Sequence, residues 1–161
     1  MRRGPASGRA GGIEVRRIDL AGYLDRPGIV RSAVGYRLAL SSEERWGKPL
    51  GDLMSRVLAD DLAQRLPGSP VVQEGAASGF ESDFILDVQV RRLDADAGGR
   101  VVLAAQVALR PRRGRGMVRA MRFEVPPADA GTAAFAAAAS AAIGQLADAI
   151  ASAAEDGHGV L

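Results

Sequence analysis

Three consecutive segments between residues 84 and 125 alternate apolar and polar side chains, and this pattern restricts the fold more than any other feature of the sequence. The first two segments, 84–91 and 101–110, are separated by a turn at 94–99, and the third, 121–125, follows an arginine-rich turn at 111–116. Alternation with a period of two predicts strands with one face against a core and the other toward solvent. The short turns predict that the three strands form an antiparallel meander.

Two further stretches have the spacing of amphipathic helices, one before the meander and one after it. The first covers residues 50–66, where apolar side chains recur on one stripe and a Pro-Gly pair ends the pattern. The second begins near Thr132, a suitable N-cap, and its apolar stripe runs from Phe135 to Ile150. We interpret this alanine-rich stretch as a helix of the globular fold and not as a membrane span, because Asp148 and other polar residues interrupt it.

Shorter apolar runs supply the remaining strands. Residues 13–20 alternate with a shift of phase at Arg16-Arg17, which predicts one strand with a bulge. Residues 29–40 predict a hairpin, 41–44 have the S-x-x-E pattern of a capping box, and 70–73 predict a short strand. This order of elements predicts an α+β fold, with one mostly antiparallel sheet and two helices packed on one of its faces.

The length of 161 residues is that of one domain. The first residues are rich in Gly, Arg and Ala, which is typical of flexible segments. We expect a flexible N-terminal segment at 1–12, a folded domain at 13–156 and a flexible tail at 157–161.

The sequence offers little material for catalysis. It has no Cys, which excludes disulfides, thiol catalysis and thiolate metal sites, and its single His, His158, lies three residues from the C-terminus. The adjacent carboxylates Asp60 and Asp61 point in different directions on a helix, so they do not form an acid–base couple. Asp94 and Asp96 precede two glycines, but the remaining ligands of a calcium loop are missing. We therefore expect a protein that is not an enzyme, with no catalytic residues, no cofactor and no metal.

Charge is concentrated at the second turn of the meander. Residues 110–122 contain six Arg and no acidic residue, although the net charge of the whole chain is only +2. The turn is either a solvated hairpin tip or an anion-binding site for phospholipid headgroups, lipopolysaccharide phosphates or an acidic partner. As an alternative function, it would bind nucleic acid, with strong salt dependence and no sequence preference. The candidate anion-binding residues are Arg110, Arg112, Arg113 and Arg115.

The segment 22–50 carries the most specific motif. It contains Gly-Tyr-Leu-Asp-Arg-Pro-Gly-Ile-Val-Arg at 22–31, Tyr-Arg-Leu at 36–38 and Arg-Trp-Gly-Lys-Pro-Leu at 45–50. In order and spacing these runs resemble the signature of the ABC-type transport auxiliary lipoprotein (PqiC-like) family, and the predicted elements are similar over about 13–155. Two departures are Gly28, where Gln is common, and Gly47-Lys48, where the family often has Ala-Glu.

The resemblance implies an accessory protein of a lipid-transport system in the bacterial cell envelope. Its implied partners are an MCE-domain protein, an ABC permease with its ATPase, and further copies of itself as a homo-oligomer. The implied location is the periplasm, at the outer membrane, with membrane attachment through a lipid anchor. The chain as given shows neither an apolar export signal nor a lipobox Cys, so we expect the true start to lie upstream.

The same motif supplies the candidate docking residues. Trp46, the only Trp, is either packed in the core at the start of the first helix or an anchor of an interface. The arginines either form structural ion pairs with nearby acidic residues or contact a partner. The residues assigned to partner docking are Tyr23, Asp25, Arg26, Pro27, Arg31, Arg45 and Trp46.

Overall fold

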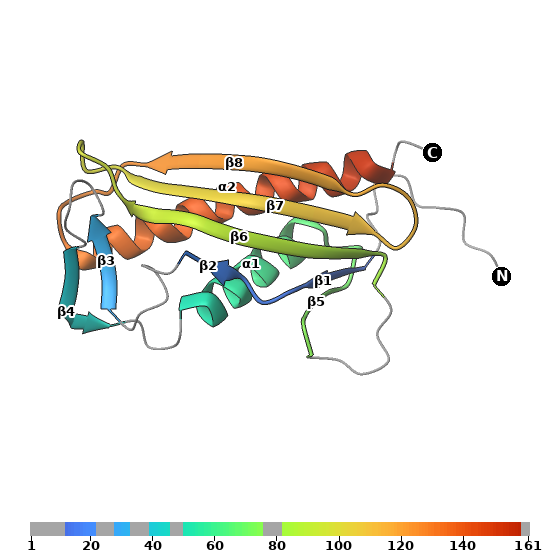
Figure 1. Ribbon diagram of the computed structural model, residues 1–161, viewed down its shortest axis with the longest axis horizontal. Helices are drawn as coiled ribbons and strands as arrows, with labels where there is room; N and C mark the ends of the chain where they lie inside the picture. The colour runs from blue at the N-terminus through green and yellow to red at the C-terminus, as the bar shows by residue number, and fades with distance from the viewer. Residues whose placement is uncertain (1–11, 22–27, 33–38, 46–49, 76–81, 159–161) are drawn as a thin grey trace.

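The computed structural model describes residues 12–21, 28–32, 39–45, 50–75 and 82–158, with side chains described for 12–21, 51–75 and 82–156. Two helices are present in these residues (Figure 1), α1 at Leu50–Arg65 and α2 at Thr132–His158. Both begin where the apolar periodicity predicts. The strands of the described residues are β1 Ile13–Val15, β2 Asp19–Leu20, β3 Gly28–Ser32, β4 Ala39–Arg45, β5 Val71–Gln73, β6 Phe84–Ala95, β7 Val101–Pro111 and β8 Met117–Val125.

The predicted meander is confirmed and is longer than expected. Strands β6, β7 and β8 pair antiparallel, with Phe84 opposite Pro111 at one end of β6 and Ala95 opposite Val101 at the other. A register shift at Val90–Arg92 bulges β6 and lets it continue through Asp94, which the sequence analysis placed in the turn. Strand β8 begins at Met117, before the predicted start at 121. Residues 118–120 are exposed and do not alternate between apolar and polar side chains, so the sequence pattern did not reveal this part of the strand.

The expectation of a mostly antiparallel sheet is wrong, because the sheet is mixed. Strands β1, β2 and β3 lie one after another along the edge of β6 that β7 does not occupy, and all three run parallel to β6. Strand β5 pairs parallel with the other edge of β1. Alternation identifies the faces of a strand but not its neighbours or its direction, so these parallel pairings were not predictable from it.

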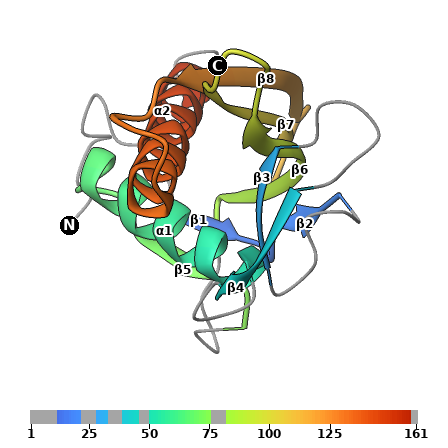
Figure 2. The ribbon, with the colours of Figure 1, turned by 90° about the vertical axis from the view of Figure 1, so that its left-hand side faces the viewer.

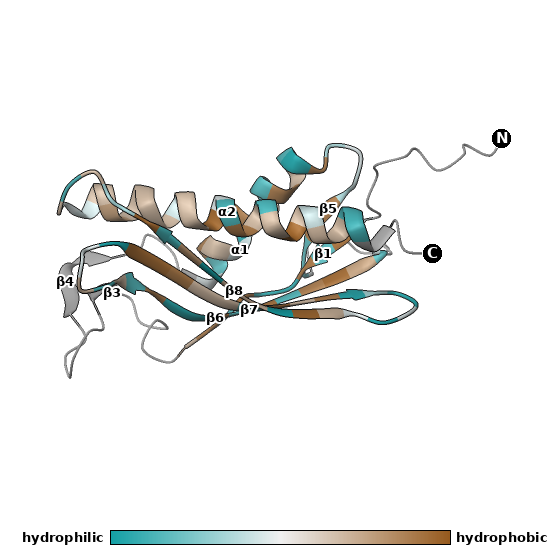
Figure 3. Cartoon of the chain, turned by 90° about the horizontal axis from the view of Figure 1, so that it is seen from above, coloured by the Kyte–Doolittle hydropathy of each residue, from teal (hydrophilic) through white to brown (hydrophobic). Residues whose placement is uncertain are grey.

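Both helices cover the same face of the sheet, as predicted (Figure 3). Helix α2 packs against β7, β8 and α1, whereas α1 packs against β5 and α2. The even-numbered residues of β6 up to Val90 and the odd-numbered residues of β7 point into this layer. Burying each large aliphatic side chain contributes about 1.5–3 kcal/mol. Residues buried in this core include Ile13, Leu58, Leu62, Leu86, Val90, Leu103, Leu146 and Ile150.

The predicted hairpin is confirmed, with β3 and β4 antiparallel and Val30 opposite Leu40. It lies at the end of β6 where Ser32 pairs with Ala95, and Figure 2 shows it from that end. The predicted capping box is wrong, because residues 41–44 belong to β4 and α1 begins only at Leu50. The S-x-x-E spacing also suits a strand with polar residues on both faces, so the motif alone did not decide between the two structures.

By length and composition, one helix of the described residues, spanning Thr132–Asp156, could cross a membrane. The sequence analysis interpreted this stretch as a helix of the globular fold because polar residues interrupt it. Its apolar character comes largely from alanine, and its buried stripe, which includes Phe135, Leu146 and Ile150, fills the core. The same composition therefore serves close packing of α2 on the sheet.

Candidate functional site

Of the residues assigned to docking, two lie in the described part of the chain. Arg31 belongs to β3 and Arg45 to β4, where Arg45 is opposite Gly28. Tyr23, Asp25, Arg26, Pro27 and Trp46 lie outside the described residues. The hairpin thus brings two separate runs of the motif to one end of the sheet.

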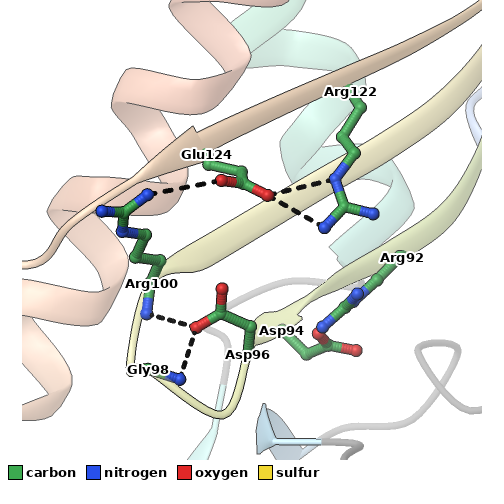
Figure 4. Close-up of polar contacts among 7 residues, drawn as sticks. All are labelled: Arg92, Asp94, Asp96, Gly98, Arg100, Arg122 and Glu124. Carbon is green, nitrogen blue, oxygen red and sulfur yellow. Dashed lines mark hydrogen bonds and ion pairs between the residues drawn. The ribbon is translucent and has the colours of Figure 1, made fainter.

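The β6–β7 turn is at this same end, and the carboxylate of Asp96 shapes it (Figure 4). The Asp96 Oδ1 atom accepts hydrogen bonds from the backbone N–H groups of Gly98 and Arg100, each at 2.9 Å. Because this carboxylate accepts two backbone hydrogen bonds, it stabilises the turn and is not free to bind a cation. On β8, Glu124 lies 2.9 Å from the Arg122 guanidinium and 3.6 Å from that of Arg100.

A buried ion pair lies beside the turn on β6. Asp94 is only 1% exposed, and its Oδ1 atom lies 2.6 Å from Nε of Arg92. The two residues are on the same face of β6, opposite Val102 and Ala104 of β7. A buried carboxylate needs such a partner, since removing the partner leaves an uncompensated charge. The carboxylates of Asp94 and Asp96, which were considered as ligands of a calcium loop, are therefore already bound to other groups of the protein.

The basic turn lies at the opposite end of the sheet. Arg110 at the end of β7 pairs with Asp87 of β6 at 2.5 Å, so this arginine is tied to the sheet. Residues 112–116 are all exposed, and Gly114 has a φ of 96°, a conformation that glycine adopts without strain. Within the described residues, Arg113 and Arg115 form no ion pair with an acidic side chain. Of the four predicted anion-binding arginines, these two present their charge to solvent most freely.

Hydrogen bonds connect this turn to the start of the described chain. The N–H of Arg112 donates to the carbonyl oxygen of Asp83 at 2.8 Å, and the N–H of Asp83 donates to the carbonyl oxygen of Gly12 at 2.8 Å. The Asp83 carboxylate accepts a hydrogen bond from the N–H of Gly12 at 3.1 Å. Gly12, Asp83 and Arg112 therefore form one continuous backbone cluster.

A polar pocket of about 240 Å³ lies between α1, β1 and β5. In its lining, Nε of Arg17 lies 3.4 Å from Oδ1 of Asp52, and the backbone N–H of Arg17 donates to the Glu74 carboxylate at 3.0 Å. Ser55, also in the lining, joins the β1–β2 connection to α1, accepting from the N–H of Ile18 at 3.0 Å.

One carboxylate has a perturbed pKa, and it lies outside this pocket. Burial raises the pKa of Asp61, and the nearby Asp60 and Asp148 raise it further, whereas the Arg65 guanidinium lowers it. Arg65 lies 4.0 Å from Asp61 and also pairs with Asp148 of α2. The i,i+4 pair of Asp61 and Arg65 is therefore part of the contact between the helices.

Within the described part of the chain, no group of three or more His, Cys, Asp or Glu residues is arranged to hold a metal ion. The polar clusters found there connect elements of the fold. The β3–β4 hairpin and the basic turn lie at opposite ends of one long sheet.

The sequence pattern of a known family covers nearly the whole chain. The family described as the ABC-type transport auxiliary lipoprotein component matches residues 2–151. The chain belongs to this family. The resemblance inferred from the motif at 22–50 is therefore confirmed. No functionally curated protein matches the sequence significantly.

Solved structures share the fold of this family member. A protein described as uncharacterized has 25% sequence identity and a TM-score of 0.73, with 91% of this chain and 92% of that chain covered. A Xanthomonas campestris protein has 21% identity and a TM-score of 0.72, with 91% and 85% covered. A dodecamer of PelC from Paraburkholderia phytofirmans has 16% identity and a TM-score of 0.51, with 89% and 90% covered.

Sequence reasoning missed the polar contacts that connect distant segments. Ser55 falls inside the first predicted helix but not on its apolar stripe. Asp94 falls in a predicted turn, and Arg92 lies between that turn and the preceding predicted strand. The spacing of Arg92 and Asp94, two residues apart, places both on one face of a strand and was the available signal. Nothing local marks Ser55, because its partner Ile18 is 37 residues away in the sequence.

Proposed function

We propose that this protein is a non-enzymatic accessory component of an ABC/MCE-type lipid-transport system in the periplasm, acting by docking to its partners. The observation that carries the proposal is the family match across residues 2–151, which names an auxiliary transport component. The proposed docking site is the β3–β4 end of the sheet, which includes Arg31 and Arg45. The other docking residues proposed from the motif, which lie outside the described residues, are Tyr23, Asp25, Arg26, Pro27 and Trp46.

The geometry of the hairpin supports this choice of site. Within the described residues β4 pairs only with β3, so its other edge is available for another chain. An open strand edge can add a strand from a partner through backbone hydrogen bonds. Arg31 and Arg45, one on each strand, would then contribute the side-chain part of the recognition.

Self-association is a second element of the proposal. Strand β8 pairs only with β7 in the described part of the chain, which leaves a nine-residue edge. PelC, which shares the fold, is a dodecamer. We expect the protein to form a homo-oligomer through such edges, and sedimentation velocity of the purified chain would show a single species larger than 16.7 kDa. A monomer at every concentration tested would contradict this element without affecting the docking site.

The docking proposal is tested by binding to an MCE-domain protein from the same organism. The wild-type chain should co-purify with it, and the double variant Arg31→Glu/Arg45→Glu should reduce the affinity at least tenfold. A control variant, Arg56→Glu/Arg115→Glu, makes the same change of charge at exposed positions on α1 and in the basic turn, and should bind as wild type does. Circular dichroism should show that both variants are folded.

If the wild-type chain does not bind the MCE-domain protein, the proposed transport role is wrong. If binding occurs but the hairpin variant and the control lose affinity equally, the transport role stands and the location of the docking site is wrong.

A further inference from the structure

The basic turn is combined with an exposed apolar side chain. Val118, two residues beyond the turn, is 63% exposed, and it is the one large hydrophobic residue of the described chain that is mostly open to solvent. Arg113 and Arg115 lie close to it in sequence, are exposed, and form no ion pair within the described residues. Cationic residues beside an exposed apolar side chain are the composition of a surface that rests on an anionic lipid bilayer.

This surface lies at the end of the molecule where the described chain begins. Phe84 pairs with Pro111 on one side and with Ile13 on the other, so β1 starts beside the basic turn (Figure 1). A chain tethered to a membrane near its N-terminus would therefore bring the basic turn against the headgroups.

The two ends of the sheet are far apart. Strand β6 runs from Phe84, beside the basic turn, to Ala95, beside the β3–β4 hairpin. Eleven residue steps of extended chain span about 35 Å. A molecule resting on the basic turn would hold the hairpin roughly that distance from the bilayer surface.

We propose that the β7–β8 turn, with Arg113, Arg115 and the nearby Val118, is a contact site for anionic phospholipid headgroups. The turn orients the protein with the β3–β4 hairpin directed away from the membrane. This proposal goes beyond the proposed function by giving the protein an orientation at the membrane. It rests on the proposed function only for the location of the protein in the cell envelope. Nucleic acid is less favoured because the turn has no aromatic side chain on which a base could stack.

The test uses the full chain and vesicles of phosphatidylcholine and phosphatidylglycerol, mixed two to one, at low salt. We expect co-sedimentation with these vesicles, weak binding to pure phosphatidylcholine, and loss of binding at high salt, where charges are screened within about 3 Å. The variant Arg113→Gln/Arg115→Gln should lower the partition coefficient roughly 25-fold, since each basic residue near an anionic surface contributes roughly fivefold. The control Arg56→Gln/Arg100→Gln removes the same charge elsewhere and should change it less than twofold.

The absence of cysteine allows a direct measurement of orientation. The variants Val118→Cys and Ala97→Cys, each labelled with a polarity-sensitive fluorophore, report from the basic turn and from the opposite β6–β7 turn. With anionic vesicles, the label at 118 should shift to the blue and the label at 97 should not.

Equal shifts at both labels would overturn the proposed orientation. Equal losses in the turn variant and its control would overturn the site, and so would binding of duplex DNA at lower concentrations than vesicles by the same arginines. No transporter protein is present in the assay, so failure here is distinct from failure to bind the MCE-domain protein.

Discussion

Arg65 of α1 and Asp148 of α2 form the ion pair that joins the two helices. The same guanidinium donates through Nη1 to the carbonyl oxygen of Asp61 at 3.0 Å and lies 4.0 Å from the Asp61 carboxylate. One arginine thus faces two carboxylates at the open side of the interface between the helices. Because the Asp148 side chain is 65% exposed, water competes for this contact.

We predict a modest coupling between Arg65 and Asp148. A double-mutant cycle with Arg65→Gln and Asp148→Asn, measured by urea unfolding, should give an interaction free energy of about 0.2–1 kcal/mol. Exposed ion pairs are screened by salt, so the coupling should decrease as NaCl is added. A coupling well above this range that does not change with salt would show that the pair is effectively buried.

The pKa of Asp61 predicts a pH-dependent effect of its replacement. Burial is the main cause of the raised pKa, so folding favours the protonated form of this carboxyl. Its contribution to the free energy of unfolding is complete below the ordinary value of 3.8 and is lost as pH rises through the folded-state pKa. Asn cannot ionise and avoids this loss. The variant Asp61→Asn should therefore gain stability relative to wild type between pH 3.5 and pH 7.

The measurement is urea unfolding of both proteins at the two pH values. Glu155→Gln is the control, because Glu155 is exposed on α2 and the substitution removes one negative charge as well. Its stability relative to wild type should change little over the same range. If Asp61→Asn loses stability toward neutral pH, attraction to Arg65 outweighs burial and the direction of the pKa shift is wrong.

Ser55 should be important for stability although it is one small side chain. It is 5% exposed, accepts from the N–H of Ile18 and donates to the carbonyl oxygen of Gly51 at 2.8 Å. Ser55→Ala leaves the buried N–H of Ile18 without an acceptor, which costs about 1–3 kcal/mol. Ser152→Ala, at an exposed position of α2, should be neutral or slightly stabilising. Equal effects of the two variants in denaturant melts would mean that water replaces the lost hydroxyl.

The sequence predicts well those features that repeat along the chain. The stripes of α1 and α2 begin at Leu50 and Thr132 as periodicity predicts, and the alternation in β6 and β7 identifies their buried faces. Each of these features depends only on which side chains within one segment face the core. This locality is the reason that elements and faces were predicted more accurately than their pairing.

Pairing between distant segments was not predictable in the same way. Strand β1 lies between β5 and β6, which follow it in the sequence only after α1, and its parallel direction depends on the path of the intervening chain. The basic turn was recognised from its composition. Its position beside Gly12 depends on the Phe84–Pro111 and Phe84–Ile13 pairings, which no motif reveals.

Two helical glycines should respond to alanine in different ways, and the comparison tests the packing of α1. At Gly144 of α2 an added Cβ would meet only Arg65 Nη2 at 3.5 Å, an ordinary contact, so Gly144→Ala should raise the free energy of unfolding by about 1 kcal/mol through helix propensity. At buried Gly51 the Cβ would lie 3.1 Å from the carbonyl oxygen of Ile18, a residue whose N–H donates to the Ser55 hydroxyl. Gly51→Ala should therefore be at least about 1 kcal/mol less favourable than Gly144→Ala, because strain cancels the propensity gain. Equal stabilisation in paired urea melts would mean that the β1–β2 connection moves away from α1 easily and does not fix its position.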